Sequence, residues 1–140
     1  HKDCDYLTMA TAGNCVDFGD LIRHNHYCTG VGSGSGDRGL QMGGMARNPP
    51  SGGFYTDEIQ YVDISTPGNA TDSGDLAYAS GEMVAGSNNA TDGFKSGGYN
   101  SGSAQNYIQK SVLATGANAT DYGDLLSATF VCTGTSGNAA

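Results

Sequence analysis

Short runs of alternating apolar and polar residues, each closed by glycine, asparagine or aspartate, make up most of the chain. Residues 6–10 and 59–64 are two such runs, and this pattern is typical of short β-strands joined by turns. No window of a dozen residues keeps a helical apolar period free of glycine. Glycine, serine, asparagine and threonine also disfavour helix interiors. The pattern therefore predicts an all-β protein.

One eight-residue motif, here called the octet, occurs three times. The octets begin at Asn14, Asn69 and Asn118, and each ends in Asp-x-Gly-Asp-Leu. An extended run precedes each octet, at residues 6–11, 61–66 and 110–115, and another run follows it. A segment ending in Gly-Gly recurs at 39–44 and 93–98. We predict that the octet is a turn between strands and that each unit holds about four antiparallel strands, like a propeller blade.

The length of 140 residues predicts one repeat domain, 1–140, with units at about 5–59, 60–108 and 109–140. The third unit stops where a Gly-Gly strand is due, and the first starts just after such a strand. Propellers usually need four or more blades. Three arrangements fit: a piece of a longer propeller, neighbouring chains that complete one another, or an open sandwich.

The octets, together with residues 5–13 and 37–44, resemble Kelch-like propeller repeats. More closely, they are similar to the "NATDFGDL…RGVFGGG" repeats of large phage and environmental surface proteins. The resemblance covers essentially the whole chain. It implies a propeller-like fold in an extracellular, cell-surface or virion-surface setting. It implies no reaction, because such repeats serve as scaffolds.

Composition removes several classes of function. The chain has 14 acidic and 6 basic residues, for a net charge of −8, so no basic stripe is present to bind nucleic acid. No apolar run reaches the roughly 20 residues of a membrane-spanning helix, so we expect no membrane insertion. Charged residues make up only 14%, and 8 tyrosines and 4 phenylalanines are present, which argues against an acidic disordered tail.

Two polar motifs, one of which also occurs outside the octets, could add glycans or a bound ion to the predicted scaffold. Three Asn-Ala-Thr sequons make candidate N-glycosylation sites, at Asn69, Asn89 and Asn118. The octets also hold paired carboxylates that are weak Ca²⁺ candidates: Asp17, Asp20, Asp72, Asp75, Asp121 and Asp124. Binding of these carboxylates to backbone N–H groups in a turn is the favoured interpretation. A pair that recurs in every unit is a poor acid–base couple, so we expect no catalytic residues, resident metal or cofactor.

Four cysteines are disulfide candidates: Cys4, Cys15, Cys28 and Cys132. Four cysteines allow three pairings, and buried free thiols are the alternative. Cys28 and Cys132 each lie seven residues beyond the leucine of an octet. An even count in an extracellular-type chain with little charge favours disulfides.

These observations predict a non-enzymatic structural subunit. Open strand edges in a glycine-rich chain invite pairing with another copy, and a head-to-tail contact that does not close yields a fibre. We therefore expect copies of the chain to assemble into an extracellular or virion-surface fibre. The alternative is a carbohydrate- or receptor-binding adhesin module of a larger propeller, with Tyr99, Asn100 and Tyr107 as stacking candidates.

Overall fold

The computed structural model describes residues 2–32, 37–47, 52–82 and 84–135, and all its regular elements are β-strands. The all-β prediction is therefore confirmed. Within these ranges, no helix is long and apolar enough to cross a membrane. The strands are β1 (Asp3–Tyr6), β2 (Val16–Asp20), β3 (Asn25–His26), β4 (Thr29–Gly32), β5 (Arg38–Arg47), β6 (Gly53–Asp63), β7 (Thr71–Asp75), β8 (Ala85–Asn88), β9 (Asp92–Ser96), β10 (Tyr99–Asn100), β11 (Ser103–Val112) and β12 (Thr120–Thr129).

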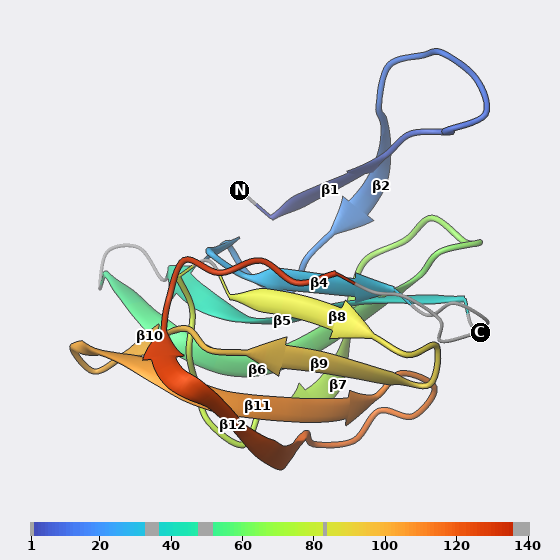
Figure 1. Ribbon diagram of the computed structural model, residues 1–140. Coiled ribbons are helices and arrows are strands. Elements are labelled where there is room, and N and C mark those ends of the chain that lie inside the picture. Colours follow the sequence, from blue (N-terminus) through green and yellow to red (C-terminus); the bar gives the residue numbers. More distant parts are fainter. Residues whose placement is uncertain (1, 33–36, 48–51, 83, 136–140) are drawn as a thin grey trace.

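The strands form three antiparallel groups (Figure 1). β1 and β2 form a hairpin. In the first sheet, β4, β5, β6 and β7 pair in chain order, and β3 pairs with the far end of β5. In the second sheet, β8, β9, β11 and β12 pair in chain order, and β10 pairs with the start of β11. Each sheet is thus a simple meander that ends in an octet.

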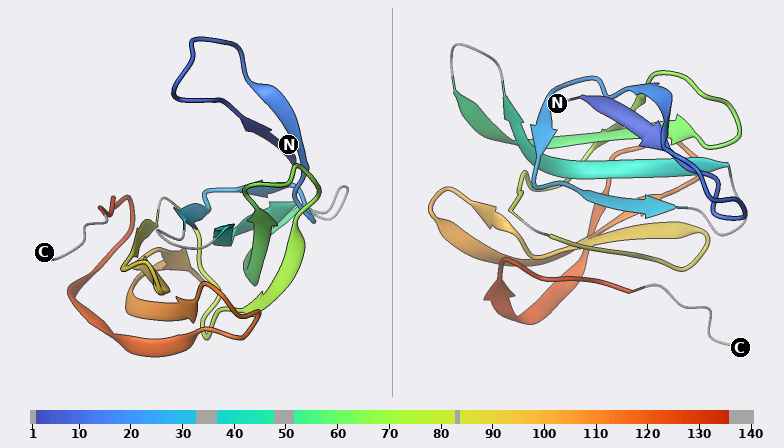
Figure 2. Two further views of the ribbon diagram at one scale, coloured as in Figure 1. Left: turned by 90° about the vertical axis from the view of Figure 1, so that its right-hand side faces the viewer. Right: turned by 90° about the horizontal axis from the view of Figure 1, so that it is seen from above.

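The two sheets lie against each other, with β4 beside β8 and β9, whereas the β1–β2 hairpin stands away from them (Figure 2). Their contact is sealed by a cluster of buried apolar side chains. Its members are Val31, Leu40, Met42, Ile59, Leu76, Leu113 and Ala119. The first five of these residues lie in the first sheet or directly after it, and Leu113 and Ala119 lie in the loop between β11 and β12. The core is therefore built from residues of both sheets and their connecting loops.

The prediction that the octet is a turn was wrong, because each octet forms an outer strand: β2, β7 or β12. In all three strands the pairing skips one residue, which makes a β-bulge at Phe18, Ser73 and Tyr122. The glycine after each bulge has a positive φ, of 144°, 105° and 150° in turn. An aspartate followed by such a glycine is also a common turn signature, so the local sequence pattern does not separate the two.

The runs predicted before the octets are strands only in part: the first residue of 6–11 and the first halves of 61–66 and 110–115. β1, β6 and β11 end at Tyr6, Asp63 and Val112, and loops follow them. In the first two loops a turn is closed by hydrogen bonds from the backbone N–H of Thr11 to the Thr8 carbonyl and of Thr66 to the Asp63 carbonyl. The hairpin ends with the first octet and the first sheet ends with the second, so the borders between these strand groups differ from those of the units at 5–59, 60–108 and 109–140.

Candidate functional site: the octet junctions

Successive octets are joined by the same pair of hydrogen bonds, an arrangement here called the octet junction. At the first junction, the Asp20 N–H donates to Asn69 Oδ1 (3.0 Å) and the Ala70 N–H donates to the Asp20 carbonyl (2.8 Å). At the second, the Asp75 N–H donates to Asn118 Oδ1 (3.1 Å) and the Ala119 N–H donates to the Asp75 carbonyl (2.7 Å). The start of each later octet is therefore bound to the end of the octet before it.

The octet glycine makes room for this approach. A Cβ on Gly19 would lie 2.4 Å from the Gly68 carbonyl oxygen, and a Cβ on Gly74 would lie 2.8 Å from the Ala117 carbonyl carbon. Gly68 and Ala117 are the residues directly before the second and third octets. Because the obstacle is backbone, it cannot rotate away, so close contact between units requires glycine here.

Apolar side chains lie beside both junctions. Ile59 and Ala119 belong to the same core cluster at the second junction. At the first junction, Cys4 and Ala70 line one pocket of about 170 Å³. Cys4 and Ile59 occupy the same place in the repeat, since each pairs with the octet glycine of its own hairpin.

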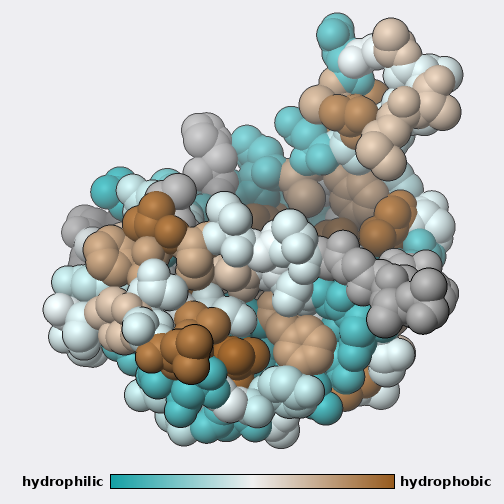
Figure 3. Space-filling view, viewed as in Figure 1, coloured by the Kyte–Doolittle hydropathy of each residue, from teal (hydrophilic) through white to brown (hydrophobic). Residues whose placement is uncertain are grey.

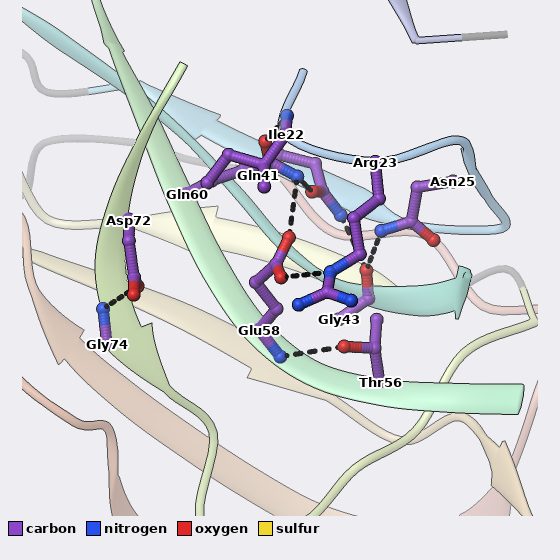
Figure 4. A network of polar contacts seen from close by, with 10 residues as sticks. All are labelled: Ile22, Arg23, Asn25, Gln41, Gly43, Thr56, Glu58, Gln60, Asp72 and Gly74. Atoms are coloured by element: carbon purple, nitrogen blue, oxygen red, sulfur yellow. Dashed lines mark hydrogen bonds and ion pairs between the residues drawn. The ribbon is translucent and has the colours of Figure 1, made fainter. Parts of the chain in front are cut away.

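Buried glutamines add a second tie between units. Gln60 Oε1 accepts the Ile22 N–H (2.7 Å), and Gln109 Oε1 accepts the Tyr78 N–H (2.8 Å). Both glutamines are almost fully buried and lie opposite an octet aspartate. Figure 4 shows Gln60 among its neighbours, including the hydrogen bond from its Nε2 to Gln41 Oε1 (2.6 Å).

An ion pair lies beside the first of these ties. Arg23 Nε donates to Glu58 Oε2 at 2.6 Å (Figure 4). This hydrogen bond raises the pKa of the Arg23 guanidinium, so the arginine stays charged at any working pH. The pair joins the segment after the first octet to β6. It adds to the contacts between the chain after the first octet and the first sheet.

The third octet is uncovered in the described part of the chain. Its bulge residue Tyr122 is 62% exposed, whereas the equivalent Ser73 is 2% exposed, and Leu126 is fully exposed. Nothing described lies within 4 Å of a Cβ placed on Gly123. Apolar surface is visible where β12 runs (Figure 3). At the other end of the array, Asn14 and Cys15 are exposed at the start of the first octet. The chain thus displays both halves of an octet junction.

Two of the octet aspartates bind the backbone of their own bulges. Asp72 Oδ1 accepts the Gly74 N–H (2.8 Å), and Asp121 Oδ1 accepts the Gly123 N–H (3.1 Å). Binding to backbone N–H groups was the favoured interpretation, and for these two aspartates it occurs in a bulge and not in a turn. Asp20 pairs with Lys2 at 2.7 Å. The described residues contain no group of three or more His, Cys, Asp or Glu side chains able to hold a metal ion, and the aspartates of different octets are spread along the array.

The three sequon asparagines are exposed, and each side-chain oxygen has a partner. Asn89 Oδ1 accepts the N–H groups of Thr91 (3.1 Å) and Asp92 (2.7 Å) in the loop between β8 and β9. Asn69 and Asn118 hold the octet junctions, a role that our sequence analysis missed. The available signal was the asparagine that opens every octet, including the first, which carries no sequon.

The four cysteines are free thiols in this structure, so the expected disulfides are not seen within the chain. The Cys28 thiol lies beside Gln41 in β5, and its burial raises the pKa of the thiol. The Cys132 thiol donates to the Ser96 carbonyl on β9 at 3.6 Å. Cys4 lies in β1, and Cys15 lies in the exposed loop directly before β2.

A second feature is a polar hollow at the surface between the outgoing segment after β7 and β11. Its volume is about 370 Å³. Tyr78 and Tyr107 line it and stack on each other with ring centroids 4.2 Å apart. Asn100 lines it too, but Tyr99 packs edge-on against Tyr55 and Phe130. Two of the three predicted stacking candidates therefore come together here.

Neither a protein-family model nor a curated protein matches this sequence. The resemblance to Kelch-like and phage-type repeats therefore stays a prediction.

Proposed function

We propose that this protein is a non-enzymatic structural subunit, and that its copies join head to tail into an extracellular or virion-surface fibre of propeller-like units. One observation carries the proposal: a single chain exposes both halves of a junction that it uses twice internally. A surface that is complementary to another surface of the same molecule makes a head-to-tail contact. Such a contact propagates as a filament unless its rotation closes a ring.

Two further observations support an assembling role. Among the described strands, β2 and β12 each pair with one other strand only, and unpaired edges are templates for another chain. The polar side chains of the junctions are engaged in hydrogen bonds that hold units together, which is the work of a scaffold. The three sequons would place N-glycans along the surface of such a fibre.

The direct test is the size of the purified chain as a function of its concentration. Sedimentation velocity should show a series of growing species, and negative-stain microscopy should show thin rods of varying length. A single monomeric species up to near-millimolar concentration would overturn the proposal.

A second candidate, a carbohydrate-binding adhesin module, is favoured by the Tyr78–Tyr107 hollow. An aromatic face beside amide and hydroxyl groups, here those of Asn100 and Ser101, is the mixture that a sugar ring needs. A glycan array probed with the chain, followed by titration of any hit against Tyr107→Ala, tests this candidate. Binding of equal strength by both proteins, or no hit, would reject it.

A further inference from the structure

We infer that the contact between copies is a third octet junction: Gly13, Asn14 and Cys15 of one copy bind the exposed third octet of the next. This inference rests on the proposed self-assembly and names the surface that performs it. The occupant is a second copy of this chain because the chain itself carries the matching half.

The backbone of the third octet has the geometry of the first two. Asp20, Asp75 and Asp124 occupy the same register, opposite Asp3, Glu58 and Tyr107. The N–H and carbonyl that Asp20 and Asp75 direct toward the next unit are therefore directed to the same side at Asp124. No asparagine side chain or alanine N–H from the described residues is bound to Asp124. Asn14 Oδ1 and the Cys15 N–H of another copy supply these two groups.

The space at the third octet also matches. At the internal junctions Gly68 and Ala117 press against the octet glycine of the preceding unit, but Gly123 has no such neighbour. The equivalent residue before the first octet is Gly13, and nothing lies within 4 Å of its Cβ position either. Two open backbone surfaces, each of the kind that the internal junctions bring together, are therefore available at opposite ends.

The apolar side chains beside the junctions predict which residues meet. Ala70 and Cys4 line one pocket, and Ala119 and Ile59 belong to one core cluster. The next pair in this series is Cys15 of the incoming copy and Ile108, which pairs with Gly123 as Cys4 and Ile59 pair with their glycines. Ile108 is only partly buried, whereas Ile59 is fully buried. Cysteine is a small apolar side chain, so it takes the place of alanine in this contact.

This pairing makes a cross-link the sharpest experiment. In the variant Ile108→Cys, oxidised glutathione should join position 108 of one copy to Cys15 of the next, with glutathione accepting the two electrons. Non-reducing electrophoresis should show a ladder of covalent oligomers, and peptide mapping should identify the bond. The ladder should vanish in Ile108→Cys with Cys15→Ser. Val112→Cys, on the same strand but at its other end, is the matched control and should give no bond to Cys15.

A non-covalent test uses Asn14. Loss of one hydrogen bond should weaken assembly of Asn14→Ala by about fivefold to tenfold and leave its denaturant midpoint unchanged, since no described residue binds the Asn14 side chain. Asn118→Ala, which breaks an internal junction, should lower the midpoint instead.

The outcomes separate the inference from the proposed function. Rods that form without a bond between position 108 and Cys15 would overturn the inference and keep self-assembly. A monomer at every concentration would overturn self-assembly itself. Capture at position 108 of a cysteine from a different protein, with none of Cys15, would also overturn the inference.

Discussion

Lys95 stands out because its ammonium group is buried and no carboxylate of the described residues pairs with it. The side chain is fully buried, and Nζ donates to Ser80 Oγ and to the Gly97 carbonyl at 3.3 Å. Burial lowers its pKa from 10.5 to about 8, because desolvation disfavours the charged form. Gln41 stands at the equivalent place in the first sheet, where its Nε2 donates to the Gly43 carbonyl. A neutral amide can therefore make the same hydrogen bond to the glycine carbonyl.

We predict that Lys95→Gln stabilises the protein at neutral pH. Below pH 8 the lysine is charged in both the folded and the unfolded state. Its desolvation then destabilises the folded state. Between pH 8 and 10.5 the unfolded chain binds more protons, so the stability of the wild type rises with pH, by about 3 kcal/mol in total. Urea unfolding at several pH values measures this rise as the difference between wild type and variant, which cancels the other titrating groups. Parallel curves for the two proteins would show that Lys95 is not desolvated.

At the scale of the element, the octet is a bulged outer strand whose form suits the contact it makes. The bulge moves the glycine to a positive φ and turns the Asp N–H and carbonyl toward the neighbouring unit. The same bulge recurs in β2, β7 and β12 although the residue in it changes from Phe18 to Ser73 to Tyr122. The backbone arrangement is therefore fixed by the Asp-x-Gly-Asp frame, and the variable residue follows its surroundings.

We predict that Gly74→Ala destabilises the protein more than Gly123→Ala. Both substitutions place a Cβ at positive φ, which costs about 1 kcal/mol or more. Only at Gly74 does the Cβ also collide with backbone, at 2.8 Å from the Ala117 carbonyl carbon. We expect an additional loss of about 2 kcal/mol there, in line with strained backbone sites. Chemical denaturation of the two variants measures the difference. Equal losses would mean that the junction yields without cost.

The all-β class and the repeat are legible in the sequence because they depend on local composition and on self-similarity. The octet junctions are not, because they join residues 49 and 43 positions apart. The octet itself misleads, since asparagine, aspartate and glycine mark turns and bulges alike. For the cysteines, the sequence shows their positions in the repeat, but it does not show which strand each thiol faces. That depends on how the sheets pack.

At the scale of the whole molecule, the short-range attraction at an octet junction is opposed by the long-range repulsion between negatively charged copies. The octet junction is made of backbone groups, one amide side chain and small apolar groups, all of them neutral. The molecule as a whole carries a net charge of −8, so two copies repel each other as they approach. This repulsion is screened by salt over a Debye length of about 10 Å at 0.1 M, compared with about 30 Å at 0.01 M.

We therefore predict that assembly strengthens with ionic strength. At one protein concentration, sedimentation velocity should show longer species as sodium chloride is raised from about 0.01 M to about 0.1 M. Lowering the pH toward the range where carboxylates protonate should act in the same direction, since it also reduces the negative charge. Asn14→Ala should remain the less assembled protein at every salt concentration, because it changes the contact and not the charge. If salt instead dissolves the fibres, ion pairs and not a neutral octet junction must hold the copies together.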